Sequence, residues 1–190
     1  MIILTLGLIL FLSVHSIRII APDLREKVIA RRGIGAWMWP YTLVAGIGFA
    51  FVIIGYGVAR YDAPALYYPP AELRQLALLV MLPVFPLLLA TYLRGRFRQM
   101  LGHPMMIATL LWAVAHLMVR GTLADLLLFG GFLVWAGFAW RSQVKRGATG
   151  SSRVRLPWGR NDAVAIIGGL ALYFVFIVGL HALLFGVSPI

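Results

Sequence analysis

The sequence passes from a basic loop into an apolar segment in the stretch Arg98-Gln-Met-Leu-Gly-His103-Pro104-Met-Met-Ile-Ala-Thr-Leu-Leu-Trp112-Ala-Val-Ala-His116. Proline is tolerated in the first turn of a helix, because its missing N–H has no partner there in any case. Pro104 therefore predicts the start of a helix, with His103 at its rim on rigid backbone. His116 lies about 20 Å further along at the α-helical rise. The two histidines indicate a functional site on this helix, and the simpler interpretation is that His103 only touches lipid headgroups.

The rest of the chain has the composition of a membrane protein. Of its 190 residues, 62% are hydrophobic and 12% are charged, whereas soluble domains are about half apolar and a quarter charged. The apolar segments are continuous and do not alternate with polar residues, which favours helices over strands. We therefore expect an all-α, polytopic bundle of about six transmembrane helices, forming a single domain over residues 1–190 in a lipid bilayer.

Six apolar spans are predicted, joined by short basic or polar loops. They cover about Ile2–Ile20, Tyr41–Ala59, Gln75–Leu93, His103–Val119, Thr122–Trp140 and Ala163–Val187. The first loop is expected over Ala21–Pro40, and Pro83 and Pro86 are expected to kink the third span. The Gly- and Ser-rich stretch at 147–152 is expected to be mobile.

The distribution of basic residues predicts how the chain crosses the membrane. Thirteen Lys and Arg lie in the loops after the first, third and fifth spans, and three lie in the other two loops. Because cytoplasmic loops are enriched in Lys and Arg, we expect the three basic loops in the cytoplasm and both termini outside it. The net charge of +11 is thus interpreted as a topology signal and a source of lipid contacts, with no nucleic acid as partner.

This orientation sorts the four histidines into two pairs of similar depth. His15 lies near the cytoplasmic end of the first span, and His103 opens the fourth span from the same side. His116 and His181 lie near the outer ends of the fourth and sixth spans. An ionisable residue inside a span is costly, so each histidine is a candidate functional residue.

The inner pair suits a haem. His15 and Arg18 are three residues apart and share a helix face. Two neutral imidazoles facing each other across an apolar slot would ligate haem iron. Its propionates would bind basic residues of the first span and third loop, drawn from Arg18, Arg94, Arg96 and Arg98. The simpler interpretation is that this face of the first span only packs and that Arg18 reaches lipid phosphate.

The outer pair gives a less specific pattern. Trp112 and His116 are four residues apart and share a face, and Asp125 opens the next helix. A contact between His116 and Asp125 would orient the imidazole for a metal or proton role. A structural histidine with a satisfied hydrogen bond is the simpler interpretation, for His116 as for His181.

These motifs resemble the NnrU family of membrane proteins, whose relatives include the plant 15-cis-ζ-carotene isomerase. The matching residues are Val14-His15-Ser16-Ile17-Arg18, Arg98, His103-Pro104-Met105, Leu111-Trp112-Ala113-Val114-Ala115-His116-Leu117 and Asp125. In the isomerase branch the resemblance implies haem b with two histidine ligands, which map onto His15 and His103. In the bacterial branch it implies an accessory role near nitrite and nitric oxide metabolism, in the inner membrane.

The chain also departs from the isomerase branch. That enzyme is thought to exchange one haem ligand for a cysteine thiolate, and this chain has no cysteine. Met105 stands where the isomerase has glutamine. The likeness to the isomerase therefore favours haem binding over carotene isomerisation by that ligand exchange.

Three functions stay open at this point. The first is a haem b protein that acts as a redox protein or an isomerase-like enzyme, with a hydrophobic small molecule or a redox protein as partner. The second is a non-enzymatic assembly or accessory subunit whose histidines are structural. The third is a membrane methyltransferase. Residues Trp140–Lys145 disfavour the methyltransferase, because they lack the acidic residues that its cofactor site needs.

Overall fold

The computed structural model describes residues 1–147 and 155–190, and these residues group into two compact units. Unit 1 comprises Met1–Tyr68 and Gly121–Ala139, and unit 2 comprises Pro69–Arg120 and Trp140–Ile190. The stretch at 147–152 that was expected to be mobile lies outside the described residues, apart from Gly147.

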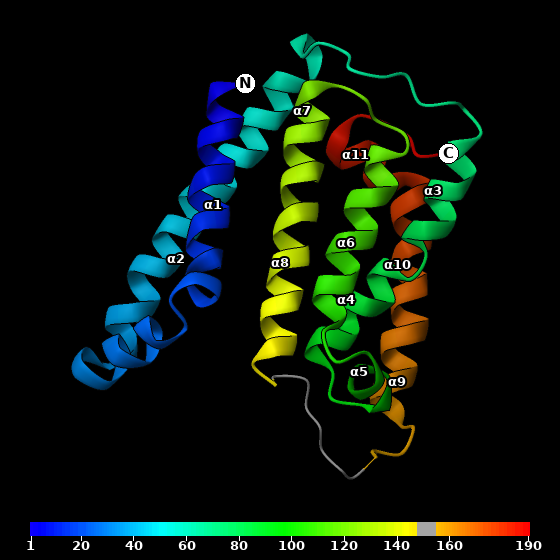
Figure 1. The fold of residues 1–190 in the computed structure, drawn as a ribbon. Coiled ribbons are helices and arrows are strands. Elements are labelled where there is room, and N and C mark those ends of the chain that lie inside the picture. The colour runs from blue at the N-terminus through cyan, green and yellow to red at the C-terminus, as the bar shows by residue number, and fades with distance from the viewer. Residues whose placement is uncertain (148–154) are drawn as a thin grey trace. The chain divides into compact units, whose positions relative to one another are not determined.

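The described residues form helices and no extended strands (Figure 1). Unit 1 holds α1 (Ile2–Ile20), α2 (Pro22–Asp62), α7 (Leu123–Asp125), the π-helical Leu126–Gly130 and most of α8 (Gly131–Lys145). Unit 2 holds α3 (Leu73–Met81), α4 (Val84–Tyr92), α5 (Arg96–Leu101), α6 (Pro104–Leu117), α9 (Arg160–Ala163), α10 (Gly169–Val175), α11 (His181–Phe185) and the π-helical Val164–Gly168 and Phe176–Leu180. The predicted all-α class is confirmed.

Five helices in this part of the chain are long and apolar enough to cross a membrane. They are Ile2–Ile20, Pro22–Asp62, Leu73–Tyr92, Leu123–Lys145 and Arg160–Phe185, and the apolar α6 is shorter. The predicted polytopic membrane bundle is therefore confirmed, with five full-length spans and one short apolar helix.

The predicted loop over Ala21–Pro40 is wrong, because this segment is helical. Helix α2 begins at Pro22, which occupies the first turn, and Asp23 adds a negative charge at the same end. The helix is broken only at Gly33, whose φ of 80° is a conformation that glycine adopts without strain. The residues before Gly33 are rich in charge, so their hydropathy is typical of a loop. The proline and the aspartate that mark a helix start are nevertheless present.

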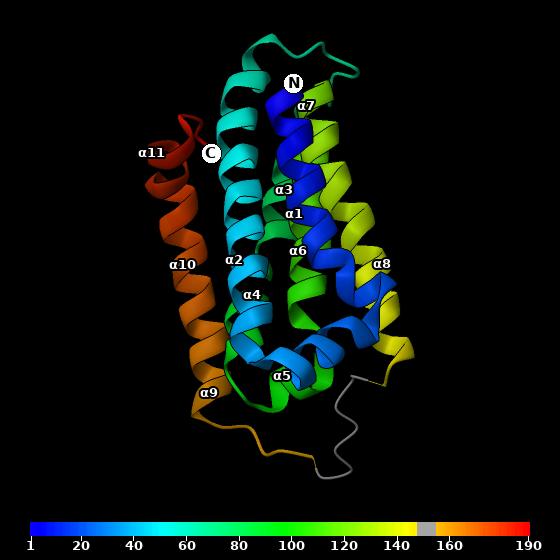
Figure 2. The ribbon, with the colours of Figure 1, turned by 90° about the vertical axis from the view of Figure 1, so that its left-hand side faces the viewer.

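In unit 1, α1 lies side by side with the part of α2 that follows Gly33 (Figures 1 and 2). Glycines make this close approach possible. A Cβ on Gly7 would come within 2.6 Å of the Val52 backbone nitrogen, and one on Gly48 within 2.7 Å of the Phe11 backbone nitrogen. Small residues let the backbones of membrane helices come together in this way.

Asp125 ties the second segment of unit 1 to α2. Its carboxylate accepts hydrogen bonds from the Thr122 N–H at 3.0 Å, the Thr122 hydroxyl at 2.6 Å and the Tyr56 hydroxyl at 2.7 Å. The residue is 2% exposed. Asp125 therefore caps its own helix and links that helix to α2.

In unit 2, the third predicted span is interrupted as expected. Helix α3 ends at Met81 and α4 begins at Val84, so the break falls at Leu82 and Pro83. The core includes Val84, Leu87 and Ala108, which join α4 to α6. This packing sets the position of α6 and its histidines within the unit.

A second buried carboxylate joins two short helices of unit 2. Asp162 of α9 accepts a hydrogen bond from the Phe97 N–H at 2.8 Å, in the first turn of α5. It also accepts one from the Gly159 N–H at 2.9 Å. The basic segment around Arg96 and Arg98 is therefore held to α9 by a hydrogen bond from its backbone to the Asp162 side chain.

Candidate functional site

His103 lies where the sequence predicts it, immediately before α6, with Pro104 at the first helical position. Gly102, at a φ of 69°, turns the chain from α5 into α6. The His103 side chain is 8% exposed, and its Nε2 is buried with no hydrogen-bond partner among the described residues. Leaving a buried polar atom unpaired costs about 1–3 kcal/mol.

The protonation of His103 follows from its surroundings. Burial disfavours a charged imidazole, and the positive charge of Arg146 disfavours it further. A neutral imidazole with an unpaired, buried nitrogen is chemically ready to bind a metal.

His15 lies in α1 among aromatic rings of unit 1. Its ring centroid is 4.2 Å from that of Phe11, 5.5 Å from Tyr41 and 6.0 Å from Trp135. The Trp135 Nε1 is buried and has no hydrogen-bond partner among the described residues. Within unit 1, the apolar face around His15 is thus built from aromatic rings of α1, α2 and α8.

A hydrogen bond fixes the tautomer of His15. Its Nδ1 lies 2.7 Å from the Phe11 carbonyl oxygen, which can only accept a hydrogen bond. Nδ1 must therefore carry the proton, and in the neutral ring Nε2 has the lone pair. Arg18, expected to contact a propionate, is exposed in the last turn of α1, and Arg98 is half-buried in α5.

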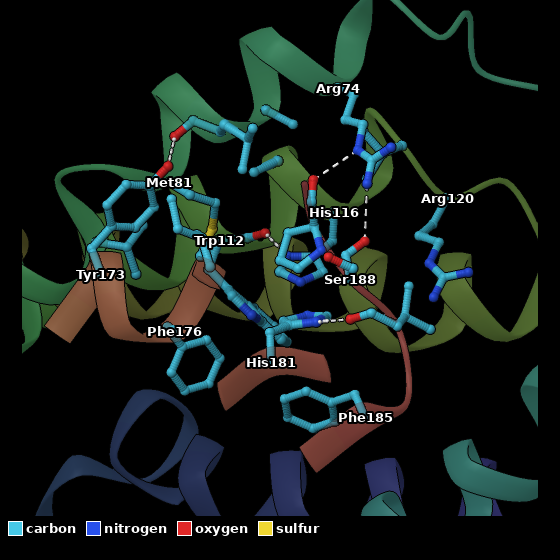
Figure 3. A pocket seen from close by; sticks show the side chains of 18 of the residues that line it. Arg74, Met81, Trp112, His116, Arg120, Tyr173, Phe176, His181, Phe185 and Ser188 are labelled. Atoms are coloured by element: carbon cyan, nitrogen blue, oxygen red, sulfur yellow. Dashed lines mark hydrogen bonds between the residues drawn. The ribbon is translucent and has the colours of Figure 1, made fainter. Parts of the chain in front are cut away.

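Unit 2 contains a partly open cavity of about 650 Å³ (Figure 3). It lies among α3, α4, α6, α10, α11 and the C-terminal residues. The main aromatic and sulfur-containing side chains of its wall are Met81, Phe85, Trp112, Phe176 and Phe185. The polar side chains include Arg74, His116, Arg120, Tyr173 and His181. Both histidines that the sequence placed near the outer ends of their spans therefore line one cavity.

Backbone carbonyls also fix the tautomers of these two histidines. The Nδ1 of His116 donates to the Trp112 carbonyl oxygen at 2.8 Å, and that of His181 donates to the Val187 carbonyl oxygen at 2.6 Å (Figure 3). In their neutral forms, both rings thus have Nε2 as an unprotonated nitrogen.

The other polar side chains of the cavity also donate to main-chain carbonyls. The Tyr173 hydroxyl donates to the Leu78 carbonyl oxygen at 2.8 Å. The Arg74 Nε donates to the Pro189 carbonyl oxygen at 2.7 Å, and its Nη2 to that of Ser188 at 3.0 Å (Figure 3). Arg74 thereby folds the C-terminal residues over the cavity.

The sequence did not predict Arg74 or Tyr173 as residues of a site. Tyr173 lies inside an apolar span, where hydropathy alone does not set it apart, and Arg74 contacts residues more than a hundred positions away. Asp125, expected to orient His116, instead binds Thr122 and Tyr56 within unit 1. No group of three or more His, Asp or Glu suited to a metal occurs in the described ranges.

Comparison with known proteins adds one finding. A family model described as "NnrU protein" matches residues 3–189. No curated protein and no solved structure matches the chain. Because the family match spans nearly the whole chain, including every histidine named above, the protein belongs to the NnrU family.

Proposed function

We propose that this NnrU-family membrane protein binds haem b, and that His103 would be a ligand of its iron. The observation that carries the proposal is the buried Nε2 of His103, which has no hydrogen-bond partner among the described residues. Binding to iron would use this nitrogen without breaking an existing hydrogen bond. The second ligand predicted from the sequence is His15.

The chemistry of these side chains supports a haem as the ligand. The Nδ1–H of His15 is held by the Phe11 carbonyl oxygen, a contact that orients the ring and makes Nε2 a better ligand. Arg18 and Arg98 would hold the propionates through charge-assisted hydrogen bonds. When bound, haem would supply one-electron chemistry that these side chains lack.

The proposed biological role is that of a redox or isomerase-like accessory protein. It would act near nitrite and nitric oxide metabolism in the bacterial inner membrane, with both termini outside the cytoplasm. Its partners would be a redox protein or a hydrophobic small molecule within the bilayer. The low content of charged residues, 12% of the chain and concentrated between apolar spans, supports the bilayer as its solvent.

The test is to purify the wild type and four single His→Ala variants after haem supplementation. We expect His15→Ala and His103→Ala to lose most of the haem, and His116→Ala and His181→Ala to keep a wild-type haem-to-protein ratio. Oxidised and reduced absorption spectra would identify a b-type haem. Size-exclusion profiles would show that each variant is folded.

Two outcomes would overturn the proposal. One is a wild-type protein that carries no haem after supplementation, which would favour a non-enzymatic accessory subunit. The other is loss of haem only in His116→Ala or His181→Ala, because the ligands would then lie in the cavity of unit 2.

A further inference from the structure

The cavity of unit 2 has a hydrogen-bond acceptor at its wall, on His181 of α11. The Nδ1–H of this residue donates to the Val187 carbonyl oxygen, so the lone pair of the neutral ring lies on Nε2. This Nε2 accepts no hydrogen bond from the described residues, and it is not among their buried unpaired atoms. A molecule in the cavity can therefore reach it with one hydrogen-bond donor.

The surroundings of this acceptor are aromatic. The centroid of the His181 ring lies 6.0 Å from that of Phe176 and 5.0 Å from that of Phe185, and both phenyl rings line the cavity (Figure 3). A hydrogen bond made among apolar groups is electrostatically stronger than one made in water. The site therefore favours a ligand with one donor and an otherwise apolar surface.

Two other polar side chains of the wall are engaged in holding the chain. The Tyr173 hydroxyl donates to the Leu78 carbonyl oxygen. Nε and Nη2 of Arg74 donate to the carbonyl oxygens of Pro189 and Ser188. An acidic ligand would compete with the bonds of Arg74, whereas a neutral ligand would leave them intact.

The size and lining of the cavity suit a single apolar chain. Its volume of about 650 Å³ lies in the range of roughly 300–1,000 Å³ typical of small-molecule sites. Met81, Val84, Leu88 and Ile177 add apolar surface to that of the aromatic rings. Because the cavity is partly open, a longer chain can extend from it into the bilayer.

We propose that this cavity binds a neutral lipid alcohol, a molecule with one hydroxyl group on a long apolar chain. The hydroxyl donates to Nε2 of His181, and the chain lies against the aromatic and aliphatic wall. This assignment names the class of hydrophobic small molecule that the proposed function leaves open. It concerns binding alone and does not rest on haem.

The experiment measures equilibrium binding to the purified full-length protein in detergent. Radiolabelled hexadecanol is the probe in a scintillation proximity assay, and its methyl ether and hexadecanoic acid are the competitors. The ether keeps the chain but has lost the donor, so it should bind about three- to tenfold more weakly than the alcohol. The partition of each probe into protein-free detergent is measured separately and corrects this ratio. A corrected ratio of one in the wild type would overturn the proposal.

A variant assigns the preference to His181. His181→Phe keeps an aromatic ring and removes the acceptor, so the alcohol and the ether should bind the folded variant equally well. Tyr173→Phe is the matched control, because it changes another polar group of the wall and should keep the wild-type ratio. Loss of the preference in Tyr173→Phe, with the wild-type ratio kept in His181→Phe, would contradict the proposed contact. If His181→Phe does not fold, the corrected ratio of the wild type still decides the question.

The fatty acid tests the main competing ligand. Tighter binding of hexadecanoic acid than of hexadecanol, weakened by Arg74→Gln, would show that the cavity holds an anionic amphiphile instead. The haem-to-protein ratio is a separate readout, and His181→Phe should leave it unchanged. Failure of the lipid assay and failure of haem binding are therefore distinguishable.

Discussion

Among single residues, Asp125 offers a direct test of how a buried carboxylate stabilises this protein. It accepts three hydrogen bonds, so Asp125→Asn replaces one accepting oxygen with a donating amide and leaves a donor unpaired. We expect a loss of about 1–3 kcal/mol in the free energy of unfolding, measured as a lower thermal midpoint in detergent. The control Asp62→Asn changes an exposed carboxylate. Equal midpoints for the two variants would mean that Asp125 contributes little to stability.

The positions of the histidines could be predicted from the sequence, but their hydrogen bonding could not. Pro104 predicted the helix start, and His103 lies at that rim as expected. The unpaired Nε2 of His103 was not predictable, because hydropathy and spacing do not show which buried polar atoms lack a hydrogen-bond partner. The proton of His181 is likewise fixed by Val187, a contact made only because the chain turns back after α11.

At the level of elements, hydropathy predicted the apolar spans better than it predicted helix ends. The first span matches α1 at both ends, because Pro22 separates it from the next helix. The basic segment before Gly33 was missed as a helix, since its residues have no continuous apolar face. Hydropathy also does not show which glycines pack: Gly48 and Gly55 approach α1, while a Cβ on Gly57 would have no atom within 4 Å.

The contrast between Gly55 and Gly57 can be tested directly. A Cβ on Gly55 would clash with the Leu4 backbone, whereas one on Gly57 would meet nothing within 4 Å. Gly55→Ala should lower the free energy of unfolding by about 1–3 kcal/mol through overpacking. Gly57→Ala should be neutral or stabilising by up to about 1 kcal/mol, because alanine is the better helix former. Thermal unfolding of both variants in the same detergent would decide, and a stable Gly55→Ala protein would contradict the packing of α1 on α2.

At the level of the whole molecule, the class and the family were both predictable. The apolar composition and the His-Pro and Leu-Trp-Ala motifs led to an all-α membrane protein resembling the NnrU family, and the match over residues 3–189 confirms that resemblance. The grouping into two compact units was not predicted, because it depends on which helices pack together and not on hydropathy. The cavity of unit 2 was missed for the same reason.

The length of α2 bears on the orientation of the whole chain. The part of α2 from Gly33 to Asp62 alone would extend about 44 Å at the α-helical rise, more than the roughly 30 Å hydrocarbon thickness of a bilayer. The part before Gly33, which carries Arg25, Lys27, Arg31 and Arg32, is therefore expected outside the apolar core. These four residues are among the thirteen Lys and Arg of the loops that the sequence analysis assigns to the cytoplasm. We therefore expect them on the cytoplasmic side.

Reporter fusions test this orientation. Fusions after residues 33 and 98 should be active only with a reporter that works in the cytoplasm, because both follow strongly basic segments. A fusion after residue 66, between α2 and α3, should be active only with a reporter that works outside it, since this segment carries few basic residues. Activity of the outside reporter at residue 33 or 98 would reverse the predicted orientation. His103 would then face the outside, and a redox partner for the proposed haem would have to be sought on that side of the membrane.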